Sequence, residues 1–251
     1  MSVLGVLRRK RRWINDRLTQ AGQAHTFSLP NFLLHRLTLQ FIAEYSSGRC
    51  LDAGSGRSPW KQELVKRGFE VISIDVEDRA GEVDIVTDIQ DMPEIEDSSM
   101  GTVLCTQVLE HVPRPWEAAG EVSRVLQVGG VLIGSVPHLS MLHEEPHDYY
   151  RYTRYGLTAL FEAKGLKILQ MRECGGLLSF LGHTLSFILL CPFAGVPGLW
   201  QLAHGANYLF LVRALAFLDR FLGASRVFPC NYVFVAEKQS LETSPDTGVE
   251  T

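Results

Sequence analysis

The strongest constraint on the fold is an alternation, between residues 49 and 173, of short apolar runs with segments of helical length. Runs rich in Val, Ile and Leu that alternate with helices of about ten residues indicate a mostly parallel sheet with helices on both faces. The runs are RCLDAG, FEVISID, VDIVTD, GTVLCTQ and VLIGSVP, followed by LKILQMRE and NYVFVAEK. The sequence therefore predicts an α/β fold, a doubly wound Rossmann-like sheet of seven strands.

Apolar residues at helical spacing predict the segments between the strands. A leading helix is expected over residues 30–45, and further helices over residues 59–68, 115–126 and 154–165. Gly68 and Gly165 are the expected helix stops. A VGG turn is expected at Val128–Gly130, just before the fifth strand.

Length and charge limit the classes of partner. The 251 residues are enough for one sizeable core. The net charge of −4 is unfavourable for a protein that must neutralise many phosphates, so no nucleic-acid partner is expected. The run RRKRR at residues 8–12 is a local exception. It predicts either a solvated segment or a contact with anionic lipid headgroups or RNA.

Cysteine usage indicates the compartment. The five cysteines include an odd member and form no C-x-x-C pair, which fits a reducing compartment and gives no metal-ligand spacing. The N-terminus lacks a long apolar core and a small-residue cleavage site, so no secretory signal is expected. We therefore expect a cytoplasmic protein and no metal site, and leave open a peripheral contact with the inner face of the membrane.

The turn after the first predicted strand, LDAGSG, is the first candidate ligand site. Ligands of open parallel sheets bind at the carboxyl ends of the strands. Gly54 and Gly56 allow the backbone to approach a ligand closely. Pro59 stands where a dinucleotide fingerprint needs its third glycine, and no phosphate-cradling Gly-Lys loop is present. Asp52 would repel a pyrophosphate, so this turn favours a cationic ligand.

Four motifs in register resemble those of the class I S-adenosylmethionine-dependent methyltransferases. They are LDAGSG, then VISID, then VTDIQDMP, then VLCTQVLEHVPRP with VLQVGGVLIGSVP. The resemblance covers residues 30–173, with residues 231–238 as the last strand, and it implies the class I methyltransferase fold and S-adenosyl-L-methionine as cofactor. Ser58 departs from the pattern, because the family often has a third glycine there.

The same resemblance implies which residues hold the cofactor. Asp52 and the turn from Gly54 to Gly56 would hold the methionine moiety, whose cationic centres suit a carboxylate. Asp75 would accept hydrogen bonds from both ribose hydroxyls, Asp88 would accept from the adenine amino group, and Gln107 would lie beside the methionine end. Each aspartate taken alone could instead cap a helix or form a turn. The implied set is Asp52, Ala53, Gly54, Gly56, Asp75, Val76, Asp88, Ile89 and Gln107.

Two histidine-containing clusters could supply a general base. One is Glu110 with His111 in LEHVPRP, and the other is the stretch PHLSMLHEEPHDYYRYT over residues 137–153. A histidine with a pKa of about 6.5 can deprotonate a hydroxyl acceptor. His111 could instead shape the cofactor pocket, and a histidine–aspartate pair could simply close a loop. PHDYYRYT loosely resembles methyltransferases of bacterial glycan and natural-product biosynthesis. The catalytic candidates are His147, Asp148, His143 and His111.

An apolar insertion, residues 174–229, separates the last two predicted strands, and Asp, Glu, Lys and Arg are absent from Gly175 to Ala203. A helix over residues 177–190 would be about 21 Å long, short of the ~30 Å hydrocarbon thickness of a bilayer. Three interpretations remain: a lid or core that lines an apolar acceptor pocket, a peripheral membrane contact, or a homodimer surface.

The predicted organisation is a basic segment at 1–30, a methyltransferase domain at 31–238 and a disordered tail at 239–251. The predicted function is methyl transfer to a small-molecule or lipid-linked glycan acceptor, at oxygen. One alternative is a catalytically silent cofactor-fold protein that acts as a membrane-associated partner. The other is a nicotinamide-dependent oxidoreductase.

Overall fold

The computed structural model describes residues 3–56, 60–79, 81–222 and 226–240. The expected disordered tail lies outside the described residues from residue 241 onward, and so do Ser58 and Pro59.

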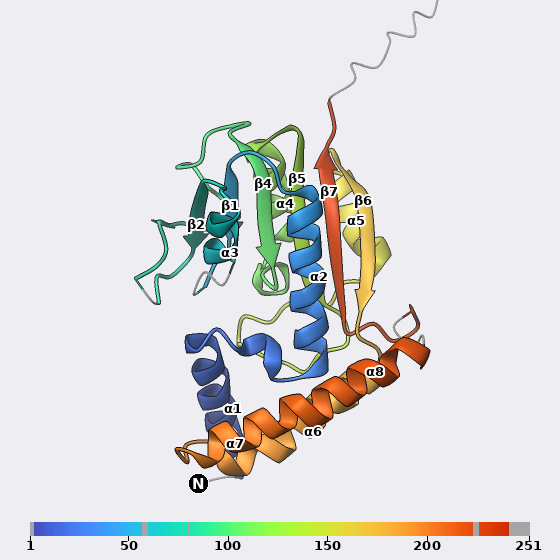
Figure 1. The fold of residues 1–251 in the computed structure, drawn as a ribbon. Helices are drawn as coiled ribbons and strands as arrows, with labels where there is room; N and C mark the ends of the chain where they lie inside the picture. Colours follow the sequence, from blue (N-terminus) through green and yellow to red (C-terminus); the bar gives the residue numbers. More distant parts are fainter. Residues whose placement is uncertain (1–2, 57–59, 80, 223–225, 241–251) are drawn as a thin grey trace, which may run out of the picture.

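A single seven-stranded sheet in the order β3-β2-β1-β4-β5-β7-β6 forms the centre of the protein (Figure 1). Strands β1 to β5 are parallel, and β7 pairs antiparallel with β5 and β6. The strand order reverses between β1 and β4, where open sheets bind ligands. The predicted seven-stranded doubly wound sheet is confirmed. Its strands are β1 Cys50–Ala53, β2 Val71–Asp75, β3 Ile85–Val86, β4 Met100–Thr106, β5 Leu126–Pro137, β6 Leu166–Cys174 and β7 Asn231–Lys238.

Helices cover both faces of the sheet, as its apolar strands require. On one face, Leu157 and Phe161 belong to a buried cluster with the sheet residues. On the other face, Phe41 and Leu64 belong to a second cluster. Burial on both faces explains why the strands are continuous apolar runs. The four covering helices are α2 Leu29–Tyr45, α3 Lys61–Lys66, α4 Pro115–Val125 and α5 Arg154–Glu162.

One local prediction is wrong, and another is confirmed with a shorter span. The expected VGG turn lies inside β5 as a bulge: Met100 pairs with Leu126 but Thr102 pairs with Val131, so the residues between are absorbed without ending the strand. The third strand is only Ile85–Val86, because the Asp84 carboxylate accepts from the Ser73 backbone N–H at 2.8 Å, in place of a strand carbonyl.

Five further helical segments lie at the end of the sheet where β4 and β6 terminate (Figure 1). We call them the helical cap. Trp13 and Trp200 pack edge to face with ring centroids 5.1 Å apart, and Ile14 and Leu18 are buried between the N-terminal helix and the insertion. The N-terminal segment is therefore packed and not simply solvated. The segments are α1 Val3–Gln20, α6 Leu177–Leu190, α7 Leu199–Ala206, a π-helical turn Asn207–Val212 and α8 Arg213–Leu222.

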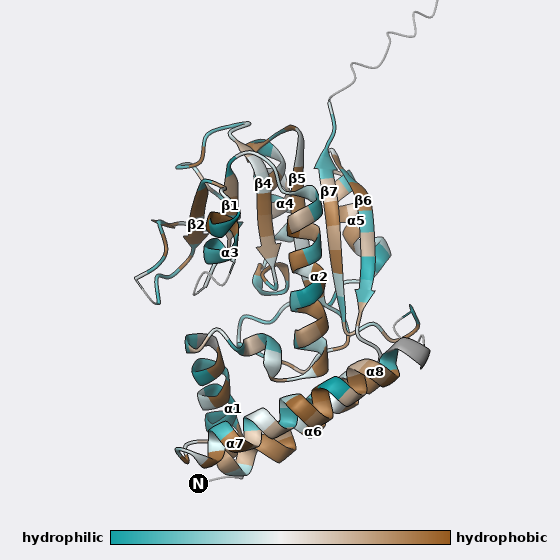
Figure 2. Ribbon diagram, in the orientation of Figure 1, coloured by the Kyte–Doolittle hydropathy of each residue, from teal (hydrophilic) through white to brown (hydrophobic). Residues whose placement is uncertain are grey.

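The surface of the helical cap is unusually apolar. Figure 2 shows hydrophobic residues along α6, α7 and α8, whereas α1 beside them is mostly hydrophilic. Among the described residues, no helix combines the length and the apolar character needed to cross a bilayer. The most exposed apolar side chains of the cap include Leu181, Ile188, Leu202, Leu209, Phe210 and Phe217, each more than half exposed.

Candidate active site

The strand β1 carries a buried carboxylate to the switch point of the sheet. Asp52 is 2% exposed, and its Oδ2 has no hydrogen-bond partner among the residues that the structure describes. Burial raises the pKa of Asp52 to about 7, with the Lys61 ammonium opposing this shift and the Asp75 carboxylate adding to it. A buried acceptor without a donor is costly. This carboxylate is therefore suited to a ligand that brings a positive charge or a hydrogen-bond donor.

Gly54 and Gly56 form the sharp turn after β1. Both have φ in the left-handed region, +72° and +57°. The N–H groups of Gly54 and Ser55 both donate to the Ile74 carbonyl at 2.9 Å, which ties the turn to β2. A Cβ at Gly54 would overlap the Val108 side chain, whereas a Cβ at Gly56 would meet open space. Gly54 is thus required for packing, and Gly56 leaves the backbone bare on an open side.

We predict that Gly54→Ala lowers the free energy of unfolding by ~2–4 kcal/mol, from left-handed strain of about 1 kcal/mol plus overpacking. Gly56→Ala should lower it by only about 1 kcal/mol, because its added methyl meets nothing. Urea unfolding of the two variants measures the difference. Equal losses would contradict the tight packing of Gly54 against Val108.

Asp75 ends β2 and reaches across to the glycine turn. Its Oδ2 accepts from the Gly56 backbone N–H at 2.8 Å, and its Oδ1 accepts from the Glu77 N–H at 3.2 Å. Each carboxylate oxygen retains a further lone pair for a ligand donor. Asp75 therefore both shapes the turn and lies beside it, while Val76 is 63% exposed at the same strand end.

Asp88 and Ile89 follow β3. Both oxygens of Asp88 accept from Gln90, from its backbone N–H at 2.9 Å and its side-chain amide at 2.8 Å. This geometry is typical of a turn residue, which is one of the two roles that the sequence allows for Asp88. Ile89 is buried at 5% exposure. The part of these two residues in binding adenine stays a prediction.

Gln107 directly follows β4 and has a strained backbone conformation. Its φ is +56°, which is uncommon for a residue with a Cβ. Its backbone N–H donates to the Ser135 carbonyl at 2.8 Å, and its amide donates to the Ser135 hydroxyl at 3.3 Å. Strain of this kind concentrates at functional sites. The conformation directs the chain from β4 into the short helical turn η2 (Leu109–His111).

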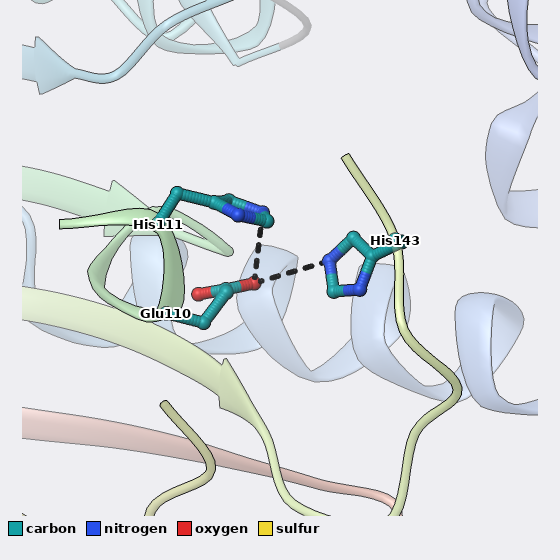
Figure 3. A group of neighbouring side chains, drawn as sticks. All are labelled: Glu110, His111 and His143. Carbon is teal, nitrogen blue, oxygen red and sulfur yellow. Dashed lines mark ion pairs between the residues drawn. The ribbon is translucent and has the colours of Figure 1, made fainter. Parts of the chain in front are cut away.

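A compact group of Glu110, His111 and His143 lies just beyond Gln107 (Figure 3). The Glu110 Oε1 is 3.7 Å from Nε2 of His111 and 3.8 Å from Nε2 of His143. The Glu110 side chain is fully buried, whereas the two histidines keep 19% and 24% of their side-chain surface exposed. Burial alone would lower the pKa of His143, but the carboxylates of Glu110 and Asp148 outweigh it and raise that pKa.

The loop after β5 is held onto η2 by backbone contacts. The N–H groups of Tyr149 and Tyr150 donate to the Glu110 carbonyl at 2.8 and 3.2 Å. The Tyr152 hydroxyl donates to the Leu109 carbonyl at 3.0 Å. These contacts bring His143 to Glu110 although 33 positions separate them in the sequence.

The other two catalytic candidates have different positions. Asp148 is held by Arg151 through contacts of 2.6 and 2.8 Å, which keep the pKa of this carboxyl well below its usual range. It also lies 3.5 Å from Nδ1 of His143. The His147 side chain is exposed, and its Nδ1 lies 3.1 Å from the Tyr149 hydroxyl. Only the His147 carbonyl reaches the group, at 2.6 Å from Nδ1 of His111.

Two residues of the site were missing from the predicted set. Glu110, noted beside His111 in the sequence, lies between both histidines. Arg151 fixes Asp148, and the sequence signal for it was only the spacing Asp148-x-x-Arg151. The structure brings His111 and His143 together with Glu110, and it keeps the side chain of His147 apart from them.

The residues at the ends of β1 and β2 fit a cationic adenosyl sulfonium donor. The unpartnered Oδ2 of buried Asp52 needs a donor or a positive charge. The open side of Gly56 gives backbone access. Acceptor oxygens of Asp75 lie next to that turn, where ribose hydroxyls could donate. The donor set is thus complementary to S-adenosylmethionine on chemical grounds.

Part of the chain is similar to known methyltransferases. Residues 51–134 match the family model described as a methyltransferase domain. The chain is 26% identical over 133 residues to a ubiquinone biosynthesis O-methyltransferase of Alkalilimnicola ehrlichii, covering 46% of this chain and 52% of that protein. The chain thus spans about half the length of this curated relative.

Two solved structures share the fold. The S-adenosylmethionine-dependent methyltransferase of Archaeoglobus fulgidus has a TM-score of 0.54 at 16% identity, with 83% of this chain and 94% of that chain covered. The cyclase SpnF has a TM-score of 0.56 at 18% identity, with 81% of each chain covered. The same fold therefore occurs in a methyltransferase and in a cyclase, and the fold alone does not define the reaction.

Proposed function

We propose that this chain, which belongs to the class I S-adenosylmethionine-dependent methyltransferases, transfers the methyl group of S-adenosylmethionine to an oxygen of a small-molecule acceptor. The observation that carries the proposal is the buried, unpartnered Asp52 carboxylate beside the bare Gly56 turn and Asp75. A sulfonium donor supplies an electrophilic methyl group, so the protein has mainly to align the acceptor and manage one proton.

The donor side of the site consists of Asp52, Gly54, Gly56 and Asp75, with Gln107 at the end of β4. Asp52 would offset the positive charge of the methionine end, and Asp75 would accept from the ribose hydroxyls. Asp88 with Ile89, and Ala53 with Val76, complete the proposed set. This division of roles rests on charge and on hydrogen-bonding capacity.

The acceptor side is the group of Glu110, His111 and His143. These three side chains converge at the same edge of the sheet and include a buried carboxylate that accepts no hydrogen bond. A hydroxyl acceptor must lose its proton as the new carbon–oxygen bond forms, and such a group can receive it. Asp148 and His147 act here as positioning residues, through Nδ1 of His143 and Nδ1 of His111.

Calorimetric titration with S-adenosylhomocysteine and with NAD separates the proposal from an oxidoreductase. We expect 1:1 binding of S-adenosylhomocysteine and none of NAD. Incubation of the protein with methyl-labelled S-adenosylmethionine and with lipid or glycan extracts then tests for activity. An enzyme would transfer the label to a compound in an extract, whereas a protein that has the fold without activity would not. NAD binding, or donor binding without transfer to any extract, would count against the proposal.

A finer proposal concerns the acceptor: we propose that it is amphiphilic, such as a lipid-linked glycan, and that the helical cap lies on an anionic membrane surface. Helix α1, which carries RRKRR at residues 8–12, packs against α7 of the cap through Trp13 and Trp200. Exposed apolar side chains lie on α6, α7 and α8 of the same cap. Basic residues beside an apolar surface are the usual composition of an interfacial contact with anionic lipids.

Helix α1 also links the cap to the acceptor side. Its Lys10 ammonium donates to the Cys191 carbonyl at 2.8 Å, in the insertion. Its Arg11 donates to the Leu142 carbonyl at 3.0 Å, one residue before His143. Arg8 pairs with Glu145 at 3.3 Å in the same loop. A lipid-anchored substrate held at the cap would therefore lie near the proposed acceptor group.

We predict that Leu202→Asp with Phe210→Asp lowers binding to vesicles containing phosphatidylserine by at least about tenfold. Both side chains are exposed, 71% and 70%, so the change removes apolar insertion without opening a core. Vesicle sedimentation measures it. Val128→Asp, on a side chain 63% exposed in the β5 bulge, is the matched control and should bind like wild type. The membrane proposal would be overturned if wild-type protein stays in the supernatant with these vesicles. It would also be overturned if wild type elutes as a dimer from size-exclusion chromatography and Leu202→Asp disrupts that dimer.

A further inference from the structure

When both histidine rings are neutral, the group formed by Glu110, His111 and His143 has three acceptor atoms that face one another, because both Nε2 lone pairs point at the Glu110 carboxylate. Within the described part of the chain, neither carboxylate oxygen of Glu110 has a hydrogen-bond partner, although the side chain is fully buried. Unpaired buried carboxylates are rare unless a charge compensates them. Both histidine rings direct Nε2 toward Oε1 of this carboxylate (Figure 3).

The outer contacts of the two rings assign their protons. Nδ1 of His111 lies 2.6 Å from the His147 carbonyl, an acceptor only, so this nitrogen carries the hydrogen. Nδ1 of His143 lies 3.3 Å from the Met141 carbonyl and 3.5 Å from Oδ2 of Asp148, also acceptors. In the neutral rings the lone pairs therefore sit on Nε2, the two nitrogens that face Glu110.

We propose that Glu110, His111 and His143 bind one first-row divalent transition-metal ion, of the class of Zn²⁺, Mn²⁺ or Fe²⁺. Two imidazoles and one carboxylate prefer such ions over Mg²⁺ or Ca²⁺, which take oxygen ligands. A tetrahedral ion with bonds of about 2.1 Å separates its ligand atoms by about 3.4 Å. The observed 3.7 and 3.8 Å need only small ring movements to reach this value.

The surroundings match those of metal-bound histidines. Such rings usually donate their other N–H to a carboxylate or a backbone carbonyl, which fixes the ring and its tautomer. Here Nδ1 of His111 donates to the His147 carbonyl at 2.6 Å, and Nδ1 of His143 donates to the Met141 carbonyl at 3.3 Å, with the Asp148 carboxylate 3.5 Å from the same nitrogen. Arg151 in turn fixes Asp148 through two contacts. Three protein ligands leave coordination positions free, and the partly exposed rings keep the group accessible.

The ion would give the acceptor side its chemistry, and this part of the inference rests on the proposed function. A hydroxyl oxygen bound to a divalent cation would lose its proton more readily than a free one, and the Glu110 carboxylate oxygen that does not bind the ion, or solvent, would take that proton. The acceptor would then be a hydroxylated compound able to coordinate through oxygen. Metal binding itself requires no methyl donor and can be tested separately.

Calorimetric titration of tag-free, chelator-treated protein with ZnCl₂ and with MnCl₂ tests the site. We expect one ion per chain for at least one of the two metals, and far weaker binding of MgCl₂. Glu110→Gln, which removes the charge but keeps the shape, should weaken binding at least about 100-fold, and His143→Asn should do the same. Glu117→Gln is the matched control: it makes the same change on a carboxylate that pairs with Arg114 outside the group, and it should bind metal as wild type does.

Thermal unfolding of each variant confirms that it is folded, and S-adenosylhomocysteine titration of the same samples reports the donor site. Lost metal binding with retained donor binding supports the inference. The inference would be overturned if wild type binds none of these ions, or if the Glu110→Gln and His143→Asn variants bind them as tightly as wild type does. The group would then hold only a proton. Absent donor binding with intact metal binding would instead contradict the proposed function.

Discussion

Replacing Asp75 by alanine is expected to lower the affinity for S-adenosylhomocysteine at least about 100-fold. Hydrogen bonds to a charged group contribute about 1.5–3 kcal/mol each, and the proposed ribose contact has two of them. The change also removes the acceptor for the Gly56 N–H, so the turn loses its tie to β2. Isothermal titration calorimetry with S-adenosylhomocysteine measures the loss.

The control for Asp75 lies on the acceptor side of the site. His147→Ala changes an exposed side chain whose Nδ1 lies near only the Tyr149 hydroxyl, and it should leave donor affinity unchanged. Asp75→Asn keeps one acceptor oxygen and should give an intermediate loss. An Asp75→Ala variant with wild-type affinity would show that the ribose assignment is wrong.

Replacing Asp52 by asparagine is expected to stabilise the fold and weaken donor binding. The pKa of Asp52 is raised from 3.8 to about 7 by burial, so the folded state holds a proton that the unfolded state has released between these pH values. The free energy of unfolding of wild type therefore falls as pH rises from about 4 to about 7, by an amount on the order of 1–4 kcal/mol. Asparagine is neutral throughout and avoids this loss.

Urea unfolding at pH 5 and at pH 8 measures this effect. The variant should exceed wild type by more at pH 8 than at pH 5, because the fall in wild-type stability continues up to the folded pKa of about 7 and other titrating groups are common to both proteins. Its affinity for S-adenosylhomocysteine should fall about tenfold or more, since the partner of the ammonium group is lost. A stability difference independent of pH would contradict the buried, protonated state of Asp52.

The sheet was predictable from the sequence because its strands are buried on both faces and read as continuous apolar runs. The glycine turn and the acidic strand ends were predictable because each lies within a few residues of its own strand. The bulge in β5 was not, since the sequence VGG has the composition of a turn whether or not the strand continues around it. Such local chemistry does not specify pairing with a neighbouring strand.

The acceptor side was only partly predictable for a different reason. His111 and His143 were both candidates, but their convergence on Glu110 depends on how the loop after β5 packs onto η2, through the backbone of Tyr149 and Tyr150. Sequence spacing does not report such long-range backbone contacts. The packing of α1 onto the insertion was hidden in the same way, because Ile14 and Leu18 lie close to a run of five basic residues.

A crystal structure of the chain with S-adenosylhomocysteine tests the donor site directly. We expect density at the carboxyl ends of β1 and β2, with the ribose hydroxyls on the Asp75 carboxylate and the ammonium group toward Asp52. Density at any other place on the chain, or none at a saturating concentration, would contradict it.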